Sequence, residues 1–322
     1  MKENIKYIII SVVLAMVTFI VGFYISRMSG NVQNTAALGK NVGNEIGKYS
    51  FINQAVTLNI GKHFIINFKP LKQQIEAVQK QYSQKTYVYF LYLNNGSWIG
   101  LNELDNFTAA STVKVPLAMA TYRAVEDGKI RLADSYTLEE LDLNRGFGDL
   151  YQAGADNSFT IGELIKIMLE NSDNTAQNAV FNALGKIGID QPLTDVYQSF
   201  GWAFDIGQTP NFGKINLKTL SDMFVALYNA KYVSIGHSQQ ILEYLNNSPF
   251  KGKIVAGVPE DIPVAHKIGI SEGDETFSDC GIVYAPNRNY LLCLGSNGGD
   301  EKKADKFMSE VSKAAYDYVI EN

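Results

Sequence analysis

Strand-like segments lie at both ends of a long region of this chain, and helical segments separate them. Residues 86–93 (TYVYFLYL) and 97–101 (SWIGL) are rich in aromatic and β-branched side chains, and Asn-Asn-Gly lies between them. This pattern predicts a hairpin. Three more strand-like segments follow near the C-terminus, at residues 264–270, 278–285 and 290–296. The strands of one sheet would therefore come from both ends of the chain.

Apolar residues at helical spacing predict the helices. Residues 70–82 begin with proline and place Leu71, Ile75 and Val78 on one face, which is typical of an α-helix. Further helices are predicted at residues 160–185, with a polar break at ENSDN, and at 215–230, 238–247 and 302–320. We therefore predict an α/β (α+β) sandwich, in which helices flank an antiparallel five-stranded sheet and an all-helical lobe is inserted. A pocket between the sheet and this lobe is the expected place for a site.

The N-terminus carries a long apolar run. Residues 7–25 contain no charged residue, and at about 1.5 Å per residue a helix of this length nearly spans the roughly 30 Å hydrocarbon core of a bilayer. Lys2 and Lys6 precede the run and Arg27 follows it, which favours an N-terminus on the inner side. We expect an uncleaved membrane anchor, and a cleaved signal peptide is the alternative.

Three parts are expected along the chain. They are an anchor at residues 1–27, a spacer at 28–68 and a folded domain at 69–322. The domain would then lie outside the cytoplasm on the cell membrane, or be secreted after cleavage. The formal net charge is −5, and without a basic stripe we expect no nucleic-acid partner. We expect a monomer.

The segment FTAASTVKVPLAMA places Ser111 three residues before Lys114. On a helix these positions are neighbours on one face. A lysine can act as the base for a serine nucleophile when burial or a second cation lowers the pKa of its amine. The spacing alone is a weak signal, because it recurs at Ser248 and Lys251. The alternative is that Ser111 caps a buried helix.

Two further motifs follow Ser111 and Lys114. They are Ser-Asp-Asn at residues 172–174 and Lys-Ile-Gly at residues 267–269. In this order, the motifs resemble those of the serine β-lactamase and penicillin-recognising peptidase superfamily, and most of all the class A β-lactamases. The resemblance covers about residues 68–322.

The resemblance implies a role for each matching residue. Ser111 would be acylated, Lys114 would take its proton, and Ser172 would relay a proton to the leaving nitrogen. The backbone N–H groups of Ser111 and Ile270 would stabilise the oxyanion. Lys267 would supply positive charge for the substrate carboxylate and would lower the pKa of Lys114. Substrate binding would fall to Asn174, Lys267, Gly269 and Ile270. Asp173 would have a structural role.

This sequence departs from the family's pattern at two places. Ile268 stands where the family carries threonine or serine, and the loss of that hydroxyl costs about 1–3 kcal/mol when its partner is charged. The family's deacylating glutamate is also missing, because residues 197–220 contain Asp205 as their only acidic residue. Acylation would still occur, and deacylation should be slow unless Asp205 activates the water.

We therefore expect an extracytoplasmic serine hydrolase that β-lactams or D-Ala-D-Ala-like peptides acylate at Ser111 and that hydrolyses the acyl-enzyme. One alternative is a D,D-carboxypeptidase or related peptidoglycan hydrolase with slow β-lactam turnover. The other is a non-catalytic cell-wall-binding protein that keeps the fold. The substrate would be a β-lactam or a peptidoglycan stem peptide. We expect no cofactor and no metal, because the three histidines lack metal-ligand spacing.

Two cysteines and one histidine lie near the third motif. Cys280 and Cys293 flank GIVYAPNRNYLL, which reads as a hairpin that would bring them close together. They could form a disulfide or remain buried thiols. His266 precedes Lys267 and should point to the opposite face of the strand, so we interpret it as a packing or surface residue.

Overall fold

The computed structural model describes residues 50–51, 66–202 and 213–322. Phe51 and the residues that follow it belong to one unit. The expected anchor at residues 1–27, most of the expected spacer at 28–68, and Asp205 lie outside the described residues. Within the described ranges, no helix is both long and apolar enough to cross a membrane.

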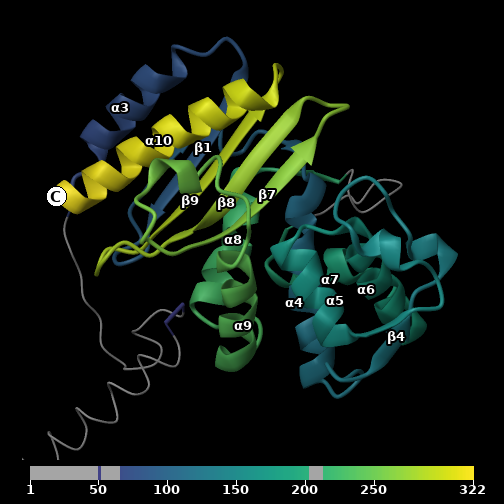
Figure 1. The fold of residues 1–322 in the computed structure, drawn as a ribbon. Coiled ribbons are helices and arrows are strands. Elements are labelled where there is room, and N and C mark those ends of the chain that lie inside the picture. The colour runs from purple at the N-terminus through teal and green to yellow at the C-terminus, as the bar shows by residue number, and fades with distance from the viewer. Residues whose placement is uncertain (1–49, 52–65, 203–212) are drawn as a thin grey trace, which may run out of the picture. The chain divides into compact units, whose positions relative to one another are not determined.

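The main sheet joins strands from the two ends of the chain (Figure 1). It is antiparallel in the order β2-β1-β9-β8-β7. The strands are β1 (Lys85–Tyr92), β2 (Trp98–Leu101), β7 (Val264–Ser271), β8 (Thr276–Val283) and β9 (Tyr290–Asn297). The predicted five-stranded sheet is confirmed, and β7 is one of its edges.

Two helices cover one face of this sheet, α3 (Lys69–Gln79) and α10 (Glu301–Glu321) (Figure 1). Their apolar stripes form a core with the strands, and Leu71, Ile75 and Phe307 are completely buried there. Burial of one such side chain stabilises the fold by about 1.5–3 kcal/mol. Ile66 and Phe68 pack into the same core.

The other helices lie between β3 and β7 in the sequence. They are α4 (Lys114–Glu126), α5 (Ile161–Glu170), α6 (Asn174–Lys186), α7 (Pro192–Ser199), α8 (Leu217–Tyr228) and α9 (Ile235–Asn246). Helices α8 and α9 contact the sheet, whereas α5, α6 and α7 pack around α4. Helix α4 is the centre of this lobe, since most of its residues are buried.

Several short elements are absent from the sequence prediction. Strand β3 (Phe107–Thr108) pairs with β6 (Lys214–Ile215), and β4 (Ser135–Thr137) pairs with β5 (Ser158–Thr160). The 3₁₀ turns are η1 (Ala110–Val113), η2 (Glu140–Asp142), η3 (Leu150–Ala153) and η5 (Val255–Gly257). Two or three residues are too few to show a period of alternation.

A disulfide joins the neighbouring strands β8 and β9. Cys280 on β8 lies directly opposite Cys293 on β9, and the two residues are bonded to each other. Both are completely buried. Of the two possibilities that the sequence left open, a disulfide or two buried thiols, the structure has the disulfide.

Gly257 tests how tightly the turn η5 packs on α10. A β-carbon at Gly257 would lie 2.4 Å from Cβ of Ser312 and 2.6 Å from the backbone nitrogen of Lys313. Gly257→Ala should therefore lower the free energy of unfolding by about 1–3 kcal/mol, measured by urea denaturation. Gly185→Ala on α6 is the control, because nothing lies within 4 Å of its added carbon. The control should raise the free energy of unfolding by at most about 1 kcal/mol. If both variants lose the same free energy of unfolding, the close packing of η5 on α10 is contradicted.

Candidate active site

The three sequence motifs meet around one cavity of about 380 Å³. Ser111 comes from η1, residues 172–174 connect α5 to α6, and residues 267–270 belong to the edge strand β7. The cavity is lined by Ala110, Ser111, Gly146, Phe147, Ser172, Asn174, Ile268, Ile270, Ser271, Glu272 and Glu301. The predicted site residues are therefore brought together, with Lys114 and Lys267 buried beneath them.

Ser111 does not act as a helix cap. It lies inside η1, and neither η1 nor α4 has a side-chain cap at its N-terminus. The turn starts from Ala110 in a left-handed conformation, with φ of 46°, which costs a non-glycine residue about 1–3 kcal/mol. Thr112 Oγ1 donates to the carbonyl of Ala109 at 2.6 Å and holds this turn. The hydroxyl of Ser111 is thereby directed to the buried Lys114.

Lys114 Nζ lies among oxygen atoms from two motifs. It is 2.9 Å from Ser111 Oγ, 2.6 Å from the carbonyl of Ser172 and 2.8 Å from Asn174 Oδ1. The two carbonyl oxygens can only accept. A neutral amine can therefore donate its two N–H groups to them and direct its lone pair at the Ser111 hydroxyl.

Burial lowers the pKa of Lys114 well below its ordinary value, and the nearby charge of Lys267 lowers it further. The uncharged amine is the form that can accept a proton from Ser111. Of the residues that sequence reasoning placed here, Lys114 has the most direct structural support for its role.

The second motif forms the start of α6. Asp173 is the N-cap, and its carboxylate accepts from the backbone N–H of Ala176 at 2.8 Å and of Leu150 at 2.9 Å. The structural role expected of Asp173 agrees with these contacts. Ser172 precedes it in a left-handed conformation, with φ of 56°, and its Oγ receives a hydrogen bond from Lys267 Nζ at 2.7 Å.

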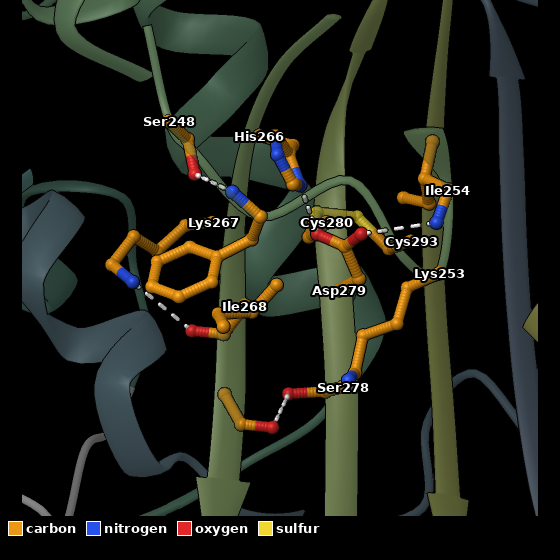
Figure 2. Close-up of polar contacts among 12 residues, drawn as sticks. Ser248, Lys253, Ile254, His266, Lys267, Ile268, Ser278, Asp279, Cys280 and Cys293 are labelled. Carbon is orange, nitrogen blue, oxygen red and sulfur yellow. Dashed lines mark hydrogen bonds and ion pairs between the residues drawn. A yellow bond between two sulfur atoms is a disulfide. The ribbon is translucent and has the colours of Figure 1, made fainter. Parts of the chain in front are cut away.

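Lys267 is almost completely buried, with 1% exposure. Besides Ser172, its ammonium donates to the carbonyl of Ile268 at 3.2 Å (Figure 2). Burial lowers the pKa of Lys267 to about 7, although the carboxylate of Asp279 acts in the opposite direction. Two buried amines thus lie on either side of Ser172, whose Oγ is 3.3 Å from Lys114 Nζ.

Strand β7 runs close to η1 because Gly269 has no side chain. A β-carbon there would lie 2.6 Å from Ser278 Oγ and 3.0 Å from Thr112 Cγ2. The carbonyl of Ile268 accepts a hydrogen bond from Lys267, and Ile270 follows two residues later on the same edge strand and lines the cavity.

His266 lies on the same strand but contributes to packing. Its Nδ1 is 2.9 Å from Asp279 Oδ1, and Asp279 Oδ2 accepts from the backbone N–H of Ile254 at 3.1 Å (Figure 2). The side chains of His266 and Asp279 are both buried. This pair fixes the turn η5 to strands β7 and β8, and the expectation of a packing role is consistent with it.

The second Ser-x-x-Lys spacing forms no site. Lys251 Nζ donates to the backbone carbonyl of Ser248 at 3.0 Å, in the loop after α9. Among the residues that the structure describes, no cluster of histidine, cysteine or acidic side chains could hold a metal ion.

Sequence reasoning missed several residues that line the cavity. Gly146 and Phe147 come from the loop before η3, and Glu272 and Glu301 come from the end of β7 and the start of α10. None of them belongs to a motif, and only the way the chain folds brings them near Ser111.

A buried lysine beside a serine on this sandwich fold defines a serine hydrolase. The chain belongs to the β-lactamase enzyme family, whose family model matches residues 70–319. It is similar to an imipenem-hydrolyzing β-lactamase of Enterobacter cloacae, with 25% identity over 293 residues that cover 83% of this chain and 92% of that protein. It is also similar to β-lactamase 1 of Bacillus cereus, with 23% identity over 257 residues that cover 75% of this chain and 81% of that protein.

Solved structures share the fold. PBP-A superposes with a TM-score of 0.72 at 21% identity, over 79% of this chain and 97% of that chain. The same figures hold for an acyl-enzyme complex of a PBP-A mutant with penicillin G. A β-lactamase from Sphaerobacter thermophilus has a TM-score of 0.71 at 22% identity, over 80% of this chain and 99% of that chain.

The buried amine of Lys267 should lower the free energy of unfolding of the protein. Lys267→Met should raise the free energy of unfolding by about 1 kcal/mol or more near pH 6.5, because no buried cation remains. The pKa of Lys267 is about 7 in the fold, against 10.5 for a free lysine. Between these values the unfolded chain holds a proton that the folded chain has released, so wild-type stability rises with pH.

The advantage of Lys267→Met should therefore shrink between pH 7 and pH 10 in urea denaturation. Lys166→Met is the control, because Lys166 is exposed on α5. An advantage that stays constant over this pH range would contradict the lowered pKa.

Proposed function

We propose that this protein is an extracytoplasmic serine hydrolase that β-lactams or D-Ala-D-Ala-like acyl peptides acylate at Ser111. The observation that carries the proposal is the 2.9 Å contact between Ser111 Oγ and the buried amine of Lys114. Kinship with β-lactamases supports the substrate class. The complex of PBP-A with penicillin G supports an acyl-enzyme on this fold.

Acylation would begin with proton transfer from Ser111 to the neutral amine of Lys114. Ser111 Oγ attacks the carbonyl carbon, and the N–H groups of Ser111 and Ile270 stabilise the negative oxygen, which typically contributes a few kcal/mol. The proton then passes from Lys114 through Ser172 Oγ to the leaving nitrogen. The carbon–nitrogen bond breaks, and the acyl group remains on Ser111.

Lys267 supports this relay from the other side of Ser172. Its ammonium donates to Ser172 Oγ at 2.7 Å, so the Ser172 hydroxyl is free to donate its own proton outward. Asn174 holds Lys114 through its Oδ1 and lines the cavity, where it can bind the substrate's amide. Because Gly269 has no side chain, β7 lies close enough to η1 for Lys267 to reach Ser172.

A D,D-carboxypeptidase or related peptidoglycan hydrolase with slow β-lactam turnover is the second candidate. The observation in its favour is that residues 197–220 contain no glutamate. Deacylation needs a base that activates water, and Asp205 is the acidic residue available in that stretch. Intact acylating groups count against the third possibility, a non-catalytic wall-binding protein.

We further propose that residues 1–27 anchor the domain of residues 69–322 to the outer side of the cell membrane through the spacer at 28–68. The support is the charge-free run at residues 7–25 and the basic residues before it. A secreted form after cleavage is the alternative.

A labelled penicillin tests acylation. The full-length chain should gain the mass of one penicillin, located on the peptide that contains Ser111, and the adduct should persist while a chromogenic β-lactam is hydrolysed slowly. Ser111→Ala should gain no mass, and Lys114→Met should acylate at least about 100-fold more slowly because the base is lost. The acylation rate should rise with pH as Lys114 loses its proton.

An absence of any adduct on Ser111 would contradict the proposal. Rapid hydrolysis would instead show that a group such as Asp205 activates water and would remove the case for the peptidase. Asp205→Asn would then reduce turnover without reducing the amount of adduct.

A further inference from the structure

The loop after α9 places an aromatic ring beside Lys267. Its sequence, Ser248-Pro249-Phe250-Lys251, repeats the Ser-x-x-Lys spacing and has no reactive role in the proposed mechanism. The Lys267 ammonium lies 6.0 Å from the centroid of the Phe250 ring. Because Lys267 is almost completely buried, the residues that exclude water from its ammonium influence whether it keeps its charge.

Three features of this loop restrain Phe250. The ring of Pro249 restricts its own backbone φ to about −65°. Ser248 is buried, and its Oγ accepts a hydrogen bond from the backbone N–H of Phe250 at 3.4 Å (Figure 2). Lys251 Nζ donates to the carbonyl of Ser248 at 3.0 Å. The second Ser-x-x-Lys segment is therefore a restrained turn that presents Phe250.

Phe147 supports the Phe250 ring from the loop before η3. The centroids of the two rings are 5.7 Å apart, and the rings are tilted by 46°, which is within the usual range for aromatic pairs. Phe147 lines the catalytic cavity, and both rings line two hollows next to it. Because Phe250 borders these hollows and also lies next to Lys267, a shorter side chain there would let water approach the ammonium.

The Phe250 ring has two opposite effects on the charge of Lys267. An aromatic face attracts a cation, but 6.0 Å is at the outer limit of about 6 Å for this contact. The ring also excludes water, and the loss of water disfavours the charged form. Burial is the main cause that lowers the pKa of Lys267 to about 7. We therefore expect the exclusion of water to be the larger effect.

Other charged groups near Lys267 stay in place when Phe250 is changed. Lys114 comes from the start of α4, and Asp279 comes from β8, where His266 Nδ1 lies 2.9 Å from its carboxylate. The charged side chains that line the cavity and the two hollows, besides Lys251, are Asp149, Asp173, Lys253, Glu272, Glu301 and Asp305. A change in the titration of Lys267 after substitution of Phe250 would therefore report the loss of the ring.

We propose that Phe250 is a positioning residue that acts through Lys267, because its ring excludes water from the ammonium and thereby lowers the pH at which acylation fails. This inference rests on acylation at Ser111 as proposed above. There, Lys267 donates to Ser172 Oγ and would supply positive charge for the carboxylate of the β-lactam or peptide. Truncation of the Phe250 ring should extend acylation to higher pH.

The pH profile of acylation by a labelled penicillin tests the inference on the full-length chain. The rate should rise as Lys114 loses its proton and fall as Lys267 loses its own, at about pH 7 in the wild type. Phe250→Ala should move the falling limb up by about one pH unit, because water then stabilises the charged amine. At pH 8 this shift would raise the protonated fraction of Lys267 about fivefold.

Two further variants separate the exclusion of water from other effects. Phe250→Leu keeps an apolar side chain beside Lys267 but removes the aromatic face, so it should move the falling limb less than Phe250→Ala does. Phe159→Ala is the matched control, because Phe159 is a half-buried phenylalanine on β5 that lines neither the cavity nor the two hollows. The control should leave the falling limb where it is in the wild type.

Urea denaturation gives a second measurement that does not depend on acylation. The pKa of Lys267 is about 7 in the fold, against 10.5 for a free lysine, so the free energy of unfolding should rise between pH 7 and pH 10. In Phe250→Ala this rise should be smaller, because the folded chain keeps its proton to a higher pH. In a Lys267→Met background, Phe250→Ala should leave the pH dependence unchanged.

The two measurements separate this inference from the proposed function. If penicillin leaves Ser111 of the wild type unmodified, the proposed function is wrong, and the urea measurement still decides whether Phe250 excludes water from Lys267. If Ser111 is acylated and Phe250→Ala leaves the falling limb in place or moves it to lower pH, acylation stands and the inference is overturned. An equal shift in Phe159→Ala would also overturn it.

Discussion

Burial of the Lys114 amine is the constraint on which the rest of the structure depends. An amine inside a protein costs free energy when it is charged. Lys114 is stable there because oxygens of Ser111, Ser172 and Asn174 surround its Nζ. The same desolvation that disfavours its charged form favours the neutral amine, which is the form that can accept a proton. Packing and chemistry therefore have one physical cause at this position.

This constraint explains why the chain needs both a sheet and a helical lobe. Helix α4 is buried at the centre of the lobe, so Lys114 at its start has a dry environment. Strand β7 is an edge of the sheet and can offer Lys267 and its backbone N–H groups to the cavity. The left-handed residues Ala110 and Ser172 store backbone strain where these two parts meet, which is common at sites that hold reactive groups.

Much of the fold was predictable because its signals are local. Runs of aromatic and β-branched residues beside turn signals revealed the strands of the sheet, and Leu71 and Ile75 at helical spacing revealed α3. The short pairs β3–β6 and β4–β5 were not predictable, because two or three residues show no period. The catalytic motifs were recognisable from their order along the chain. The cavity residues Glu272 and Glu301 were not, since only the packing of segments far apart in sequence brings them near Ser111.

By itself, the sequence determined which reactive groups the chain carries and, through the order of its motifs, the family to which it belongs. It also showed the isoleucine at position 268 and the lack of a glutamate in residues 197–220. Only the tertiary structure decided that Ser111 is no helix cap, that Cys280 and Cys293 are joined, and that Glu272 and Glu301 line the cavity. The reason is physical: propensity and periodicity act between near neighbours, whereas desolvation and charge pairing depend on which distant segments pack together.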